Sequence, residues 1–207
     1  MHKALSLLPV CAFLLAGCAG QQTGAALKDT FDSGIAAYDA GDYPKAYKIW
    51  SGIDDVDLAA MRNVAMMLRQ GQGVAKDPQK AEDLYETAAE AGLPTAQADL
   101  ADMLLKGEAG PPNPKAALPL LEAAAAANHP VAQYQLAQMY ETGANGLVPR
   151  DTVMARQLYT AAASHGMKEA QDRLNQLAAP ISPTQPAPQT APTTASAGGK
   201  DLRPGQP

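Results

Sequence analysis

Histidine and cysteine are side chains that often bind metals or act as nucleophiles. This chain of 207 residues has three histidines and two cysteines. His129 and His165 fall in stretches that are typical of turns between helices. Neither has a second His or Cys three or four residues away, so a zinc site lacks ligands. We therefore expect both to be solvent-exposed turn residues, and we expect no metal site and no cofactor.

Two further patterns resemble fragments of ligand-binding sites. Gly71-Gln72-Gly73 resembles a fragment of a phosphate-binding loop, but it follows a helical pattern and no Gly-Lys-Ser/Thr continues it. Asp54-Asp55-Val56-Asp57 gathers carboxylates without the spaced ligands and final Glu of a calcium loop. These stretches predict a repeat turn and an acidic helix terminus, so the sequence points to no catalytic site.

The composition favours an all-α protein without nucleic-acid partners. Hydrophobic residues make up 46% of the chain and aromatic residues only 5%, so Ala, Leu and Met must form the core. Alanine is the best helix former, and β-branched residues are few. The formal charge is −5, and no Lys/Arg cluster is present to neutralise phosphates.

Cys18 is the one residue for which the sequence predicts covalent chemistry. Met1-His2-Lys3 is a short basic segment, and an apolar run of 13 residues, 4–16, follows it. That run is too short to span a bilayer and is typical of a secretory signal. Its end, Leu15-Ala16-Gly17-Cys18, resembles the lipobox of bacterial lipoproteins. An ordinary secretory signal with small residues before a Cys is the alternative.

The lipobox resemblance implies cleavage before Cys18 and acylation of its sulfur and new amino group. Because Cys11 lies in the removed part, the mature chain has no second cysteine and no disulfide. Several acyl chains make a lasting membrane anchor. Ala19 follows the Cys where an Asp would mark retention in the inner membrane of enterobacteria. We therefore expect a lipid-anchored protein of the bacterial outer membrane that faces the periplasm.

The middle of the chain is repetitive. Ala-Gln recurs at Ala96, Ala132 and Ala170, at spacings of 36 and 38, and an earlier copy has only Ala60. Three glycines spaced 36 apart, Gly71, Gly107 and Gly143, end the first helix of each unit. The second helices begin at polar residues that can serve as N-caps, namely Asp42, Asp77, Asn113 and Asp151. We expect the core of these second helices to be Ala46, Ala81, Ala116 and Ala155, followed by Trp50, Tyr85, Leu120 and Tyr159.

These residues carry a family resemblance. The stretch 71–92, GQGVAKDPQKAEDLYETAAEAG, resembles the Sel1-like repeat, a relative of the tetratricopeptide repeat. Looser copies cover 94–129 and 130–166, and residues 31–52 resemble a truncated first repeat. The resemblance implies an α-solenoid of stacked antiparallel helix pairs in which each unit buries the apolar face of the next. Pro119 departs from the pattern, and we expect a kink or a late helix start there.

The predicted organisation has four parts: a signal peptide, 1–17; a lipidated N-terminus and linker, 18–29; about four helix pairs, 30–179; and a tail, 180–207. The tail is rich in Pro, Thr and Ala and has no aromatic residue, so it cannot bury enough surface to fold. A solvated tail is the simpler interpretation, and O-glycosylation is the alternative.

The resemblance implies a protein that binds other proteins without making or breaking bonds. By analogy with tetratricopeptide repeats, the inward positions of the first helices would contact a protein partner in the cell envelope: Arg62, Met66, Arg69, Asp102, Leu105, Tyr134, Gln138 and Glu141. Some Sel1-like proteins are penicillin-binding or β-lactamase-like, but those are cysteine-rich, and this chain also lacks Ser-x-x-Lys. A β-lactam-interacting enzyme and a structural or peptidoglycan-associated lipoprotein are the alternatives.

Overall fold

The computed structural model describes residues 24–178, and this part of the chain consists of helices and turns without strands. The α-helices run in chain order as follows: α1 Gly24–Asp39, α2 Tyr43–Trp50, α3 Leu58–Gln70, α4 Pro78–Glu90, α5 Pro94–Lys106, α6 Pro114–Ala126, α7 Pro130–Thr142, α8 Thr152–Ser164 and α9 Lys168–Ala178. A short 3₁₀ turn, Ala144–Gly146, lies between α7 and α8.

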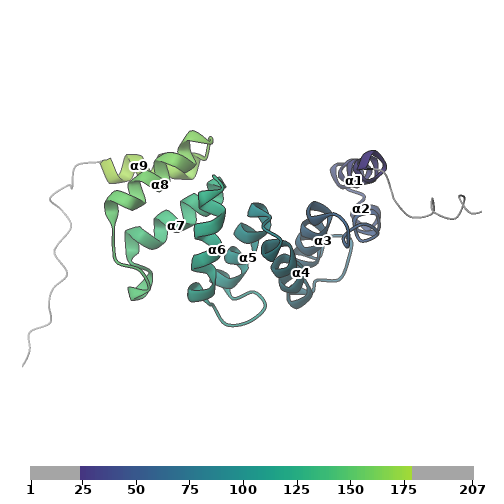
Figure 1. The fold of residues 1–207 in the computed structure, drawn as a ribbon, viewed down its shortest axis with the longest axis horizontal. Coiled ribbons are helices and arrows are strands. Elements are labelled where there is room, and N and C mark those ends of the chain that lie inside the picture. Colours follow the sequence, from purple (N-terminus) through teal and green to yellow (C-terminus); the bar gives the residue numbers. More distant parts are fainter. Residues whose placement is uncertain (1–23, 179–207) are drawn as a thin grey trace, which may run out of the picture.

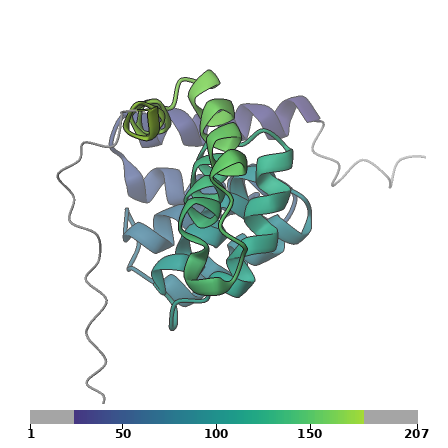
Figure 2. The same cartoon turned by 90° about the vertical axis from the view of Figure 1, so that its left-hand side faces the viewer.

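The helices form four antiparallel pairs, α1–α2, α3–α4, α5–α6 and α7–α8, and α9 packs on the last pair. Each second helix also packs against the first helix of the next pair, so the units stack in one direction. The stack is curved, and its α1–α2 and α8–α9 ends rise on the same side of the middle helices (Figure 1). Figure 2 shows the curve from its α8–α9 end. The predicted all-α solenoid is confirmed.

Local sequence signals begin and end the helices as expected. The side chains of the four predicted N-caps each accept a hydrogen bond from a backbone N–H in the first turn of their helix, at Asp42, Asp77, Asn113 and Asp151. The three repeat glycines end α3, α5 and α7 in the left-handed conformation, with φ of 73°, 68° and 78°. Glycine adopts this conformation without steric cost, which explains why it recurs at Gly71, Gly107 and Gly143.

The core consists mainly of alanines, with one large side chain at a fixed place in each second helix. Trp50, Tyr85 and Tyr159 occupy this place and are at most 2% exposed. The prediction that Leu120 is the large core residue of α6 was wrong by one residue. Counted from the N-cap Asn113, the spacing of eight residues found in the other copies leads to Leu121, which is fully buried, and Leu120 remains half-buried.

Alanine shows the same shift of one residue. Ala116, which was expected in the core, is half-buried, whereas Ala117 is fully buried, as are its counterparts Ala46, Ala81 and Ala155.

The glutamine that recurs after alanine has a structural role in two of the repeats. Gln97 and Gln133 donate from their side-chain amides to the carbonyls of Ala89 and Ala125, eight residues earlier. These carbonyls belong to the last turn of the preceding helix, and each also accepts from a backbone N–H of the turn that follows, Gly92 or Asn128.

Pro119 does not delay the helix that contains it. α6 begins at Pro114 and is helical through Ala126, so the expectation of a late start was wrong. Proline at position 119 removes the amide that would donate to the Lys115 carbonyl. Because both residues are exposed, water can serve that carbonyl, which makes the proline tolerable.

The N-terminal boundary also differs from the prediction. Helix α1 begins at Gly24, inside the segment 18–29 that was predicted to be a linker. Leu27 packs against the first core cluster, which explains why the helix extends this far. Gly34 lets α1 approach α2 closely, because a Cβ there would lie 2.2 Å from Nε1 of Trp50. None of the helices within 24–178 is long and apolar enough to cross a membrane.

Candidate partner-binding face

The eight residues predicted to contact a partner lie on α3, α5 and α7, the first helices of three successive pairs. They occupy recurring positions of the repeat: Met66, Asp102 and Gln138 share one position, and Arg69, Leu105 and Glu141 share another. Arg62 and Tyr134 hold a third position, which is Ala98 in the middle repeat. We call the surface formed by these residues and their neighbours on α9 the first-helix face.

Ion pairs connect successive first helices across this face. Nε of Arg62 on α3 donates to Oδ2 of Asp99 on α5 at 2.6 Å. Seven residues on, Nε of Arg69 donates to Oε2 of Glu108 at 2.8 Å, and its terminal nitrogen contacts Asp102. The Arg69 side chain is only 14% exposed. Its guanidinium therefore stabilises the contact between α3 and α5 and is not free to meet a partner.

Asp102 has several donors. Besides Arg69, it accepts from Nζ of Lys106 at 2.7 Å and from the side-chain amide of Gln135 on α7 at 3.0 Å. Partial burial opposes ionisation of Asp102, but the hydrogen bonds from Arg69 and Lys106 outweigh it and lower its pKa. The hydrogen bond from Arg69 likewise lowers the pKa of Glu108. At neutral pH the carboxylates of Asp102 and Glu108 are thus paired with cations of the protein itself.

The carboxylate of Glu141 also has partners within the protein. It is 8% exposed and accepts from Nε of Arg173 on α9 at 2.9 Å and from the hydroxyl of Tyr159 on α8 at 2.8 Å. The hydrogen bond from Arg173 lowers the pKa of Glu141 despite its burial, whereas burial and the bond to Glu141 raise the pKa of Tyr159. Glu141 therefore joins the last pair to α9, and its carboxylate is shielded from solvent.

The predicted residues whose side chains take no part in the ion pairs and hydrogen bonds described above are Met66, Leu105, Tyr134 and Gln138. Met66 and Tyr134 are half-buried, and Gln138 is exposed. Tyr134, Gln138 and Glu141 line one hollow of about 300 Å³, together with Arg173 and Gln176 of α9. Leu105 is half-buried and packs against the second core cluster, as Met66 packs against the first and Tyr134 against the third. The structure thus brings three of the eight residues into one hollow at the α7–α9 end.

His129 does not behave as expected. It is half-buried rather than exposed, its Nδ1 atom has no hydrogen-bond partner, and burial lowers its pKa. The charges of Asp99 and Arg62 act on it in opposite directions. His165, in contrast, is exposed at the end of α8. Within 24–178 no three His, Cys, Asp or Glu side chains are placed to hold a metal ion.

Sequence reasoning missed the internal partners of the predicted residues. Asp99, Gln135 and Arg173 share the repeat position of Asn63, one residue after Arg62 and Tyr134. All three are long or charged side chains at a position directed to the neighbouring first helix. This recurrence of polar residues was visible in the sequence, but their partners lie 32 to 37 residues away and no local pattern pairs them.

Comparison with known proteins agrees with this geometry. The family model of the Sel1 repeat matches residues 58–93, 94–129 and 130–167. A Sel1 repeat protein from Oxalobacter formigenes superimposes with a TM-score of 0.66 and 32% identity over 71% of this chain and 60% of that one. A protective antigen present in uropathogenic Escherichia coli strains gives 0.66 and 27%, over 73% of this chain and 33% of that one.

An immunity protein from Pseudomonas aeruginosa has a TM-score of 0.53 and 25% identity, over 72% of this chain and 57% of that one. The chain therefore spans less than two thirds of the length of each of these structures. The comparison with curated proteins gives no match. The Sel1 repeat fold is a scaffold for interaction between proteins, and the three matched repeats cover more than half of the sequence. The chain belongs to the Sel1 repeat proteins.

Proposed function

We propose that this protein is a lipid-anchored periplasmic adaptor that binds other envelope proteins through its first-helix face and catalyses no reaction. The anchor is the predicted lipid on Cys18, which lies outside the described residues. The observation that carries the proposal is the hollow at the α7–α9 end, which half-buried Tyr134 and exposed Gln138 line beside the buried Glu141. Tyrosine is frequent at the centres of protein interfaces because its ring is rigid and its hydroxyl can hydrogen-bond.

The ion pairs contribute to binding indirectly. They hold α3 against α5 and α7 against α9, and the hydrogen bond from Gln135 to Asp102 links α5 to α7, so the other side chains of the face are held in place before a partner arrives. Pre-ordering a surface lowers the entropy lost on binding. The names of the two relatives, a protective antigen and an immunity protein, are compatible with a binding role for this face.

Photocrosslinking in living cells tests the face. A photoreactive amino acid would replace Gln138 in one variant and Gln157 in another, since both glutamines are exposed and the second lies on α8. We expect a discrete crosslinked product from position 138 and none from position 157, and mass spectrometry would identify the partner. Equal products from both positions, or none from position 138, would contradict the proposal.

Charge reversal of Arg62 and Arg69 is a poor test of binding. Arg69→Glu would place a third carboxylate beside Glu108 and Asp102 and would remove their cation. A lost partner would then not distinguish a broken interface from a destabilised fold. Gln138→Ala avoids this problem, because Gln138 is exposed, whereas Tyr134 packs on the third core cluster and against the ring of Tyr159.

The anchor has its own test. Cells grown with labelled palmitate should label the wild-type protein and not Cys18→Ser, and the outer-membrane fraction should contain the wild type only. Cys11→Ser is the matched control, because that residue lies in the segment predicted to be removed. Labelling that persists in Cys18→Ser would contradict lipid attachment at this residue, without bearing on the first-helix face.

A further inference from the structure

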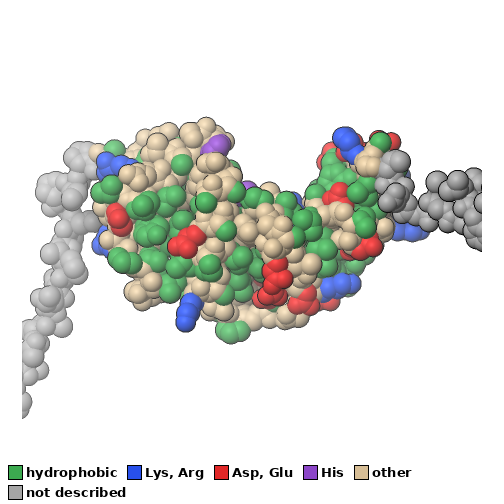
Figure 3. All heavy atoms as spheres, in the orientation of Figure 1, with side chains coloured by type: hydrophobic (Ala, Val, Ile, Leu, Met, Phe, Trp, Pro, Cys, Tyr) green, Lys and Arg blue, Asp and Glu red, His purple; other side chains and the backbone are tan. Residues whose placement is uncertain are grey.

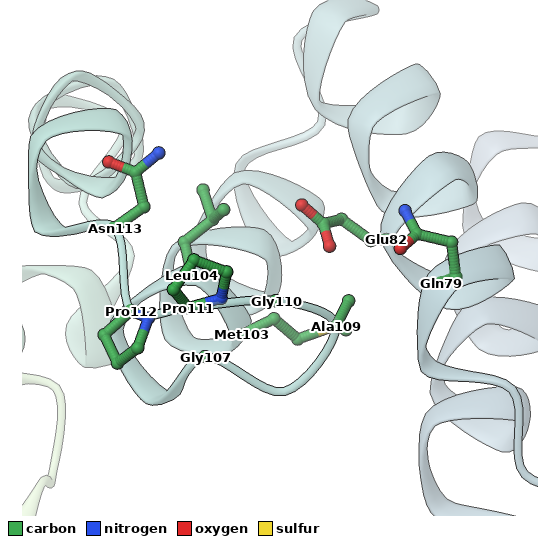
Figure 4. Close-up of a pocket in the computed structure, with 10 residues that line it drawn as sticks. All are labelled: Gln79, Glu82, Met103, Leu104, Gly107, Ala109, Gly110, Pro111, Pro112 and Asn113. Atoms are coloured by element: carbon green, nitrogen blue, oxygen red, sulfur yellow. The ribbon is translucent and has the colours of Figure 1, made fainter.

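A second groove lies on the opposite side of the solenoid from the first-helix face. It runs between α4 and α6 over α5, as two hollows of about 350 and 540 Å³ that share Glu82, Leu104 and Asn113. Figure 4 shows Glu82 of α4 beside Leu104 of α5, with the turn 107–113 along the edge of the groove. Leu100 and Leu104 lie two residues before and after Asp102, so they occupy the other face of α5.

The floor of the groove is apolar. Leu100 and Leu104 of α5 and Leu120 of α6 line it, and Leu104 and Leu120 are only half-buried. Leu120 is the residue that the repeat spacing does not place in the core. Its counterparts, one residue before Tyr85 and Tyr159, are Leu84 and Leu158, which are half-buried as well, so a half-buried leucine recurs at this position.

Gly110 enlarges the groove. Val74 and Val148 stand three residues before the N-caps Asp77 and Asp151, and both pack onto the core. Gly110 holds the same place before Asn113 and lines the 350 Å³ hollow. A Cβ at Gly110 would meet no atom within 4 Å, so the missing valine leaves open space.

One wall of the groove is acidic. Glu82, Glu86 and Glu90 follow one another at intervals of four along α4 and thus form a row about 12 Å long. None of the ion pairs within 24–178 includes them. Partial burial and the neighbouring Glu86 and Asp83 raise the pKa of Glu82, so its negative charge lacks compensation. The corresponding residues of α8 are Arg156, Thr160 and Ser164, so the acidic row belongs to this repeat.

The opposite wall offers a hydrogen-bond acceptor. Pro119 lines the groove and leaves the Lys115 carbonyl without its helical donor. Figure 3 shows acidic side chains gathered beside hydrophobic surface on the visible face of the middle helices. Apolar floor, acidic wall and free carbonyl all favour an occupant that carries apolar side chains and positively charged donors.

We propose that this groove, defined by Glu82, Glu86, Glu90, Leu104, Leu120 and Gly110, docks a basic amphipathic segment of a partner protein. The partner's Leu-like side chains enter the space left by Gly110 and cover Leu104 and Leu120. Its Lys or Arg side chains pair with the three glutamates. The protein would then hold two partners at once, one on each side of the solenoid.

A designed peptide tests the groove directly. The probe is a fluorescent helix of about 14 residues with Leu along one face and Lys along the other, and its matched control has Glu for every Lys. Fluorescence anisotropy with the purified full chain should show binding of the Lys peptide, weaker at high salt, and none of the Glu peptide. The variant E82Q/E86Q/E90Q should weaken the Lys peptide by about tenfold, since three exposed ion pairs are lost.

Matched variants distinguish this site from general attraction. The control D39N/D54N/D55N removes the same amount of charge away from the groove and should change the affinity by about twofold or less. Gly110→Val should fold like the wild type, because valine occupies this place in the other repeats, and should also weaken the peptide. Equal losses in both triple variants, or binding of the Glu peptide, would overturn the proposal. So would sedimentation showing a dimer that E82Q/E86Q/E90Q dissociates, since a second copy would then cover the groove.

Discussion

The guanidinium of Arg69 bonds to the carboxylate of Asp102, 33 residues later, and so joins two first helices side chain to side chain. Solenoids gain stability mainly from contacts between neighbouring units. Here part of that coupling comes from charges on the face that a partner would approach. The same residues that give the face its character therefore also hold its helices in register.

Replacing Arg69 with methionine should destabilise the protein by about 1–3 kcal/mol, because Asp102 and Glu108 then lose their common cation while staying partly buried. Urea unfolding followed by circular dichroism measures this change. Lys28→Met is the control, since Lys28 and Asp32 form an exposed pair within α1, and it should leave the unfolding midpoint unchanged. Equal midpoints for Arg69→Met and the wild type would show that this contact contributes nothing.

Replacing Tyr159 with phenylalanine should cost about 1 kcal/mol, because Glu141 loses the hydroxyl donor at 2.8 Å in a buried site. Tyr85→Phe is the comparison, since Tyr85 holds the same repeat position and its hydroxyl lies by the guanidinium of Arg69 instead of donating to Glu141. Its unfolding free energy should change less than that of Tyr159→Phe. An unchanged unfolding free energy in Tyr159→Phe would contradict the role assigned to Glu141.

Stability should fall in two steps as the solution is acidified. Burial lowers the pKa of His129, so the folded state disfavours its proton and stability begins to fall below the ordinary histidine pKa of 6.5. The lowered pKa values of Asp102, Glu108 and Glu141 give stability that is present above about pH 4 and is lost as pH falls through them. Unfolding free energies measured between pH 3 and 8 check both steps.

Two variants identify the side chains responsible for each of these losses of stability. His129→Asn should remove the step near pH 6 and keep the one in acid, and asparagine suits the N-cap of α7 that His129 occupies. Glu141→Gln should reduce the acid step without altering the other. A profile for His129→Asn identical to that of the wild type would show that His129 titrates as an ordinary exposed histidine.

The sequence was sufficient to predict the repeats, because their signals are local. Asp77 and Asp151 cap the helices that follow them, and Gly71 takes the left-handed conformation that ends α3, each through contacts within a few residues. The error at Leu120 came from an alignment of this repeat that was shifted by one residue. The constant spacing from Asn113 already indicated Leu121.

The candidate face could be predicted only in part. The analogy with tetratricopeptide repeats named Arg69 and Glu141 as partner contacts, but it could not show that their charges are paired with Glu108 and Arg173. Such pairing depends on side-chain length and on how far neighbouring first helices are apart, which no single helix encodes. His129 was misjudged for the same reason, because the surface that buries it lies partly in another repeat, near Asp99.

Replacing Gly34 with alanine should destabilise the α1–α2 pair by about 1–3 kcal/mol, because the new methyl group would overlap the ring of Trp50. Trp50 is the only tryptophan of the chain, and its Nε1 donates to the Phe31 carbonyl at 3.2 Å. Its fluorescence therefore reports on this pair directly. Gly24→Ala, where a Cβ meets nothing within 4 Å, should leave both emission and stability unchanged.

Replacing Pro119 with alanine should stabilise the protein by about 1–3 kcal/mol, because α6 regains the amide that donates to the Lys115 carbonyl. Part of this gain is offset, since alanine also frees the unfolded chain. Pro114→Ala is the control, because proline at the first helical position loses no bond and its removal brings none. If Pro119→Ala instead lowers the unfolding free energy in urea, the ring of Pro119 stabilises the fold by its packing beside Leu120. The free carbonyl would then be a by-product of that packing rather than a feature of the groove.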